Sequence, residues 1–187
     1  MPALFLALLT SVLAMLGARP TLLTARLSGA LGGTAGLLIA CWITAIVTAA
    51  LAGWAGGWLA PQMAPAAKAM FIAAALAVSA LELLFMRSRA APAEPTRSLG
   101  AIALVLLAEQ VTDAARFFVL ALAVATGAPP LAAAGGALGS GAVLTAAWAI
   151  AGGWEARLPL RVIRLGVSGL FLIAAVVVAL SARGVLG

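Results

Sequence analysis

The chain has 187 residues, of which 65% are hydrophobic and 9% are charged, with a formal net charge of +6 at pH 7. Soluble domains carry about 25% charged residues, so this composition excludes an ordinary soluble domain and requires a bilayer around much of the chain. Histidine is absent and cysteine occurs once, as Cys41, which excludes a disulfide framework and a thiolate zinc site. The positive charge is expected to orient membrane helices rather than to bind nucleic acid, because most arginines fall between apolar stretches.

Six apolar stretches follow one another along the chain, each about as long as the 20 residues that a membrane-spanning helix needs. We expect helices near residues 3–25, 31–52, 66–86, 99–125, 131–152 and 163–182. The first stretch lacks the basic segment that opens a secretory signal peptide, so we expect it to be a spanning helix. The sequence therefore predicts an all-α, polytopic membrane bundle of six transmembrane helices.

A polar segment at residues 87–98, RSRAAPAEPTRS, divides the chain into two expected halves, residues 1–86 and 99–187. The string GALG occurs at residues 29–32 and again at 136–139, each time expected to open a glycine-rich helix, and the third expected helix of each half follows a proline-bearing loop. Three helices per half make the second half enter the membrane from the opposite side. The pattern therefore predicts two inverted three-helix repeats, an architecture of many secondary transporters.

Arginine is concentrated on one side of the expected membrane. The opposite side carries only Lys68 and Arg183. Because basic residues are enriched in cytoplasmic loops, both termini are expected outside the cytoplasm of a bacterial-type inner (plasma) membrane. The connections after the first, third and fifth expected helices carry eight of the eleven basic residues: Arg19, Arg26, Arg87, Arg89, Arg97, Arg157, Arg161 and Arg164.

Two carboxylates lie in the middle of the fourth expected helix, within LLAEQVTDAARFFVLALA. Charge at the centre of a membrane helix costs about 2.5–3.5 kcal/mol on insertion scales, and such residues usually face the bundle interior and serve a function. Glu109 and Asp113 are four residues apart, so on a continuous helix they share one face. They could hold a hard divalent cation, with further oxygen atoms from Gln110 and Thr112, or they could carry a proton.

Arg116 leaves two other interpretations of the same face open. It follows Asp113 by three residues, so the carboxylate and the arginine could neutralise each other and serve only to fix helix packing. Alternatively, Arg116 and Arg19 could bind an anion or a lipid headgroup.

Outside the fourth expected helix, the sequence predicts a kink in the first helix and a further carboxylate in the third. Pro20 follows Arg19 in the first stretch, and a proline there removes a backbone hydrogen bond and frees carbonyls to line a cavity. Glu82 lies near the end of the third expected helix and is expected to pair with Arg87 and Arg89 at the membrane surface.

These stretches resemble the Gdt family of membrane proteins, also called uncharacterised protein family 0016. The resemblance is carried by TDAARFFVLALAVATG and by GGALGSGAVLTAAWAIAGGWEARLPLRVIRLGVSGLFLIAAVVVAL. Members have two three-helix repeats, each with a Glu-x-Gly-Asp-Lys/Arg-Thr motif in its first helix. The family is associated with manganese and calcium transport in exchange for protons.

The motif can be placed in register on both halves of this chain. In the second half, Asp113 falls on the motif aspartate, Gln110 on its glutamate, Thr112 on its glycine and Ala114 on its basic residue. Glu109 stands one position before the motif glutamate.

In the first half, LGARPT matches the motif glycine and basic residue with Gly17 and Arg19. Met15 and Ala18 then fall on its acidic positions. One of the four motif carboxylates is therefore in register.

The resemblance implies a secondary transporter that exchanges Mn²⁺ or Ca²⁺ for H⁺, with a degenerate cation site. It implies Asp113 as the principal ligand, assisted by Glu109 and Gln110, with Arg116 as a tether that an incoming cation must displace, and with Thr112 and Arg19 as further contacts. The alternatives are a structural membrane protein with a buried carboxylate–arginine pair, or a transporter of another, even anionic, substrate.

Nothing in the sequence indicates an enzyme or a site for an organic cofactor. The bilayer is the expected partner, with an inorganic cation and a proton. Glycines four residues apart permit close helix packing, either within one chain or between two copies in a homodimer.

Overall fold

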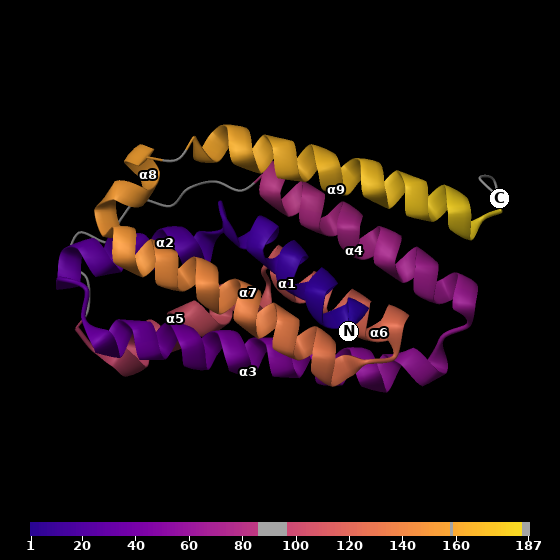
Figure 1. Cartoon of the computed structure of the whole chain (residues 1–187), viewed down its shortest axis with the longest axis horizontal. Helices are drawn as coiled ribbons and strands as arrows, with labels where there is room; N and C mark the ends of the chain where they lie inside the picture. Colours follow the sequence, from indigo (N-terminus) through magenta and orange to yellow (C-terminus); the bar gives the residue numbers. More distant parts are fainter. Residues whose placement is uncertain (86–96, 158, 185–187) are drawn as a thin grey trace.

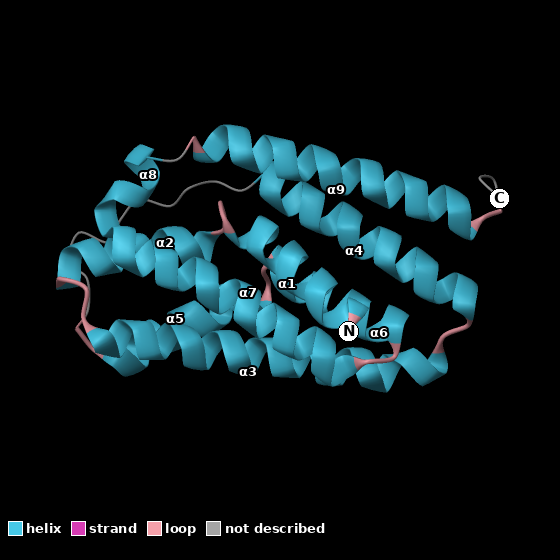
Figure 2. Cartoon of the chain, in the orientation of Figure 1, coloured by secondary structure: helices cyan, strands magenta, loops and turns pink. Residues whose placement is uncertain are grey.

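The structure, a computed structural model, describes residues 1–85, 97–157 and 159–184 and contains no strand in these ranges (Figures 1 and 2). Two short 3-10 helices, η1 (Ala60–Gln62) and η2 (Ala151–Gly153), extend the ends of longer helices. The described α-helices are α1 (Pro2–Met15), α2 (Arg19–Leu31), α3 (Ala35–Leu59), α4 (Pro65–Phe85), α5 (Leu99–Val111), α6 (Ala114–Thr126), α7 (Pro129–Ile150), α8 (Trp154–Arg157) and α9 (Leu160–Ala182).

Four of these helices, α3, α4, α7 and α9, are long and apolar enough to cross a membrane. They correspond to the second, third, fifth and sixth stretches expected from the sequence. The pair α1 and α2 passes the same test when taken as one span, whereas α5 and α6 are shorter apolar helices. The described part of the chain is therefore all-helical and suited to a multi-pass membrane protein.

The first expected helix is not continuous. It is divided into α1 and α2, which meet at an angle of 62°. The break falls at Leu16–Ala18, and Pro20 occupies the first turn of α2, where its missing N–H costs no hydrogen bond. The expected kink is thus confirmed, but Arg19 and Arg26 lie inside α2 rather than in a following loop. Likewise, Arg161 and Arg164 lie inside α9.

The fourth expected helix is also divided, a result that the sequence did not predict. Helix α5 ends at Val111, and Asp113 adopts an extended conformation (φ −82°, ψ 148°) before α6 begins. No proline or glycine stands at this break. Aspartate is favoured at the residue preceding a helix, although the Asp113 side chain makes no capping hydrogen bond.

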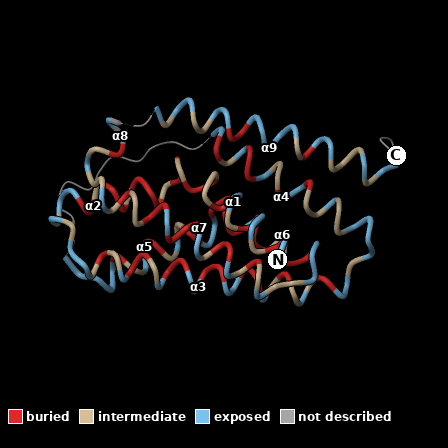
Figure 3. The backbone as a smooth tube through the Cα atoms, viewed as in Figure 1, coloured by how far each residue is buried: buried red, intermediate tan, exposed pale blue. Residues whose placement is uncertain are grey.

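The helices run roughly along one long axis (Figure 1). Helix α7 packs against α1 and α3, α4 packs against α9, and α6 contacts α1, α3 and α4. Along this axis α2 continues α1 and α6 continues α5, so that both breaks fall near the middle of the molecule (Figure 1). Most residues around the two breaks are buried, whereas many residues of α9 are exposed (Figure 3).

Small residues allow the central helices to approach closely. A side chain on Gly139 of α7 would lie 2.5 Å from the backbone oxygen of Leu8 in α1, and one on Gly56 of α3 would lie 2.7 Å from the oxygen of Leu120 in α6. Gly139, four residues after Gly135, therefore shows the close packing predicted for glycines at this spacing, and Gly56 packs closely without such a glycine neighbour.

The two GALG strings do not hold equivalent positions, contrary to expectation. The first string ends α2, where Gly32 has a positive φ of 73° that favours glycine, and the second lies inside α7. Recurrence of the string is thus a consequence of a glycine-rich composition and carries no argument for a repeat.

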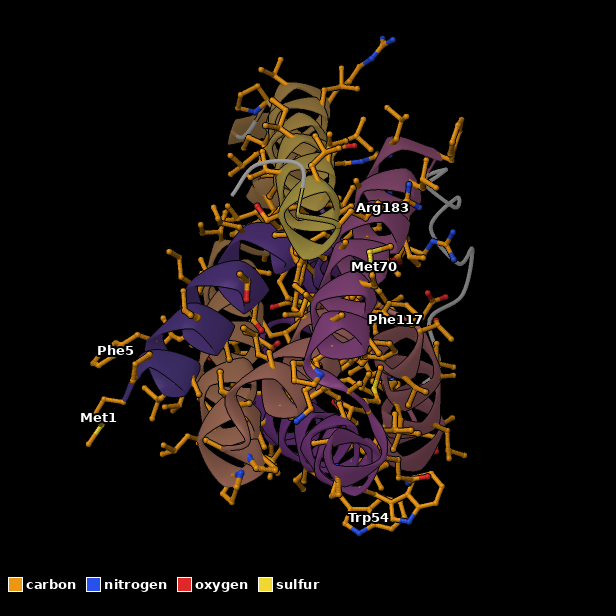
Figure 4. The ribbon with its side chains drawn as sticks, turned by 90° about the vertical axis from the view of Figure 1, so that its right-hand side faces the viewer. Met1, Phe5, Trp54, Met70, Phe117 and Arg183 are labelled. Carbon is orange, nitrogen blue, oxygen red and sulfur yellow. The ribbon has the colours of Figure 1, made fainter. Side chains whose placement is uncertain are left out.

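Large apolar side chains cover the outside of the bundle. Trp54, Trp58 and Ile173 are each more than half exposed, and Figure 4 shows Trp54 and Phe5 pointing away from the helices. A bilayer would solvate these side chains, as the composition requires.

Candidate functional site

An ion pair connects the two helix breaks. Arg19 is the first residue of α2 and Glu109 lies in the last turn of α5, and Arg19 Nη1 lies 4.0 Å from Glu109 Oε2. Both side chains are partly accessible, with exposed fractions of 38% and 15%. The pair brings charge from both halves of the chain to one place inside an apolar bundle.

Asp113 lies at the second break and is almost fully buried, with 2% of its surface exposed. Its backbone oxygen accepts hydrogen bonds from the N–H groups of Arg116 and Phe117 at the start of α6. Its side-chain Oδ2 is buried and has no hydrogen-bond partner among the described residues. Leaving a buried carboxyl oxygen without a hydrogen-bond partner is costly, which marks Asp113 as a functional candidate.

Glu82 on α4 belongs to the same site, which the sequence did not predict. The backbone N–H of Ala114 lies against the carboxylates of both Glu82 and Asp113, and the two carboxylates interact electrostatically. Glu82 also interacts with the charges of Arg19 and Glu109, and its Oε2 is buried without a partner among the described residues.

The partners expected for Glu82, Arg87 and Arg89, lie outside the described residues. We refer to Arg19, Glu82, Glu109 and Asp113 as the break cluster.

Arg116 forms a separate, fully buried network next to the break cluster. Its Nε donates to Thr48 Oγ1 (2.7 Å), its Nη1 to Ser140 Oγ (3.0 Å) and its Nη2 to Gln110 Oε1 (2.8 Å). These acceptors are neutral and come from α3, α7 and α5. No ion pair within 4.0 Å joins Arg116 to Asp113, although their charges interact. The direct carboxylate–arginine pair considered from the sequence is thus replaced by a network of neutral acceptors.

Gln110 is completely buried, and both polar atoms of its amide are engaged. Oε1 accepts from Arg116, and Nε2 donates to Thr44 Oγ1 at 2.8 Å. Thr44 and Thr48 are one helical turn apart on α3, so a polar stripe runs along this otherwise apolar helix. That spacing was visible in the sequence and would have indicated a buried polar partner.

The three cation ligands expected from the resemblance have different nearest partners in the structure. Asp113 lies with Glu82, Glu109 with Arg19, and Gln110 with Arg116. Across residues 1–85, 97–157 and 159–184, no three histidine, cysteine or acidic side chains are grouped closely enough to hold a metal ion.

The remaining expected contact, Thr112, donates to Ala108 within its own turn at 3.4 Å. Binding of a metal by this set stays a prediction.

The first break carries no carboxylate. Met15 and Ala18, at the acidic positions of the motif, are buried in the apolar core. Gly17 leaves room for the side chain of Arg164 from α9, which donates through Nη2 to the backbone oxygen of Leu83 at 3.1 Å. Helix α9 therefore contacts both the first break and the end of α4 that carries Glu82.

A cavity of about 210 Å³ reaches Arg116 from the outside of the bundle. Thr48 and Arg116 are the polar residues of its wall, and the others, among them Phe117, are apolar. Leu51 and Val111, which also line the cavity, are exposed apolar side chains.

Comparisons with family models, with curated proteins and with solved structures found no match. The resemblance to the Gdt family therefore stays a prediction.

Proposed function

We propose that the chain is a secondary transporter of the plasma membrane that exchanges a divalent cation, Mn²⁺ or Ca²⁺, for protons. The observation that carries the proposal is Asp113, a carboxylate buried at a helix break with an oxygen that no described residue satisfies. Charged groups at such depth are expensive and usually mark an ion pathway. Interrupted helices near the midplane are also where secondary transporters bind their ions.

The order of the helices agrees with this proposal. A broken helix followed by long apolar helices occurs as α1–α2, α3 and α4, and again as α5–α6, α7 and α9. We propose that α5 and α6 cross the membrane together, which makes six spans and two inverted repeats. In this topology both termini lie outside the cytoplasm, and movement at the breaks provides alternating access.

A second candidate function is structural and rests on the Arg116 network. Arg116 connects α6 with α3, α5 and α7 through hydrogen bonds to neutral groups. Such a network could fix the packing of a membrane protein that transports nothing. The two functions differ in what Asp113 contributes, because Asp113 makes no direct bond to Arg116.

The test is uptake of Mn²⁺ and of Ca²⁺ into proteoliposomes under an imposed pH gradient. The wild type should transport one or both ions, Asp113→Asn should abolish uptake, and Glu155→Gln in α8 should leave it unchanged. Circular dichroism establishes that each variant remains helical. No uptake of either ion by folded wild-type protein would reject divalent-cation exchange and favour a structural role or another substrate.

A further inference from the structure

Two carboxylates of the break cluster, Glu82 and Asp113, lie near each other, and each has an oxygen atom without a hydrogen-bond partner among the described residues. Glu82 reaches the site from α4, and Asp113 from the break between α5 and α6. Both lie against the N–H of Ala114, and each has one buried oxygen with no partner among the described residues. Buried acceptors are nearly always satisfied in folded proteins, so an unsatisfied pair indicates that something binds between them.

The neighbouring arginines are directed to other acceptors. Arg19 pairs with Glu109, and Arg116 is held by neutral hydroxyl and amide oxygens. Arg164 donates to the backbone oxygen of Leu83. The charge of Glu109 is therefore balanced by a cation that is already present, whereas Glu82 Oε2 and Asp113 Oδ2 have no cationic partner in hydrogen-bonding distance among the described residues.

We infer that Glu82 and Asp113 bind the transported divalent cation and that Glu109 does not. Their two negative charges match the two positive charges of the ion, and carboxylate oxygens are the ligands that Mn²⁺ and Ca²⁺ accept. Protons compete for the same oxygens, which would make exchange against H⁺ a property of this pair. The inference rests on the proposed function and adds Glu82, from outside the broken helices, to its site.

A structural alternative must be separated from this inference. Arg19 Nε is a buried donor without a partner among the described residues, and its charge interacts with that of Glu82. A small movement could bring Glu82 and Arg19 together as a packing contact. In that case Glu82 would contribute to stability but not to ion binding.

The experiment measures Mn²⁺ binding by isothermal titration calorimetry on the full chain in nanodiscs, together with Mn²⁺ uptake in proteoliposomes. Glu82→Gln and Asp113→Asn should each weaken binding by roughly tenfold or more, as expected when a charged ligand is lost. Glu109→Gln makes the same chemical change within the cluster and should leave the Mn²⁺ affinity within about threefold of the wild type. Glu82→Asp, which keeps the charge, should restore part of the affinity.

The outcomes distinguish the inference from the function on which it rests. Wild-type Mn²⁺ binding that is unchanged in Glu82→Gln would overturn the inference and leave the proposed function standing. Loss of binding in Glu109→Gln but not in Glu82→Gln would also overturn it. A lower melting temperature for Glu82→Gln with unchanged affinity would support the packing contact instead. Wild-type protein that neither binds nor transports Mn²⁺ or Ca²⁺ would reject the function and the inference together.

Discussion

Arg116 donates a 2.8 Å hydrogen bond from Nη2 to Oε1 of Gln110, and both side chains are buried in the centre of the bundle. Gln110 is the residue that falls on the glutamate of the Gdt-like motif. A neutral amide thus accepts from the guanidinium where that motif would supply a carboxylate. The pair lies in an environment of low dielectric constant, where a lost hydrogen bond is expensive.

Replacing Gln110 should show how much its hydrogen bond with Arg116 contributes to the stability of the protein. Gln110→Leu leaves one Arg116 donor without a partner and removes the donor to Thr44 Oγ1, which keeps its own bond to the backbone oxygen of Ala40. We expect the variant to lower the free energy of unfolding by about 2–3 kcal/mol. Gln110→Glu keeps the acceptor and makes the bond charge-assisted, so it should be at least as stable as the wild type. Thermal unfolding in detergent compares the three proteins. A Leu variant as stable as the wild type would contradict the importance of this contact.

Arg116 should not tolerate replacement by lysine. The planar guanidinium reaches acceptors on α3, α5 and α7 at the same time, which a single ammonium group cannot do. We expect Arg116→Lys to cost about 3 kcal/mol, because buried polar partners lose their donor. Arg161→Lys is the matched control, since Arg161 is exposed on α9 and should be neutral. Equal melting temperatures for the two variants would show that the simultaneous hydrogen bonds of the guanidinium to three helices are unimportant for stability.

Close packing of α7 on α1 should be sensitive to one added methyl group. In Gly139→Ala the new Cβ would lie 2.5 Å from the Leu8 oxygen, so the helices must separate, at a cost of about 1–3 kcal/mol. Gly169 on α9 has no atom within 4 Å of its added Cβ, so Gly169→Ala should be neutral or stabilising by up to about 1 kcal/mol. Unfolding midpoints of the two variants give the comparison. If both variants unfold like the wild type, α1 and α7 are not in tight contact.

The proposed orientation can be tested with introduced cysteines, because the native Cys41 is buried. Ala64 precedes α4, and Ser88 lies in the polar segment at residues 87–98. A membrane-impermeant thiol reagent added to intact cells should label Ala64→Cys. It should label Ser88→Cys only after the membrane is permeabilised, so that the reagent reaches the cytoplasmic side. Labelling of both positions from the same side would contradict the assignment of the third span.

Much of the fold could be predicted from the order of apolar stretches. The long helices α3, α4, α7 and α9 lie where hydropathy placed them, because a helix in lipid must satisfy its own backbone within one apolar segment. The first break was also predictable, since Pro20 is disfavoured in a helix interior. The second break was not, because Asp113 and its neighbours include neither proline nor glycine.

That unpredicted break explains why the expected cation ligands Glu109, Gln110 and Asp113 do not share one helix face. The spacing of Glu109 and Asp113 places them on one face only if the helix continues between them, and α5 ends at Val111. Glu109 and Gln110 are adjacent, and successive residues of a helix point about 100° apart. One of them therefore faces Arg19 and the other faces Arg116.

Local pattern and composition were sufficient for the helices, their apolar surfaces and the presence of charge inside the apolar bundle, since each depends on residues close together in the chain. The partner of each charge was not determined in this way. Glu82 meets Asp113, and Arg116 meets Thr48 and Ser140, across long separations in sequence. Such pairings depend on how α4, α3 and α7 pack around the second break. A buried charge selects its partners from whatever that packing brings within hydrogen-bonding distance.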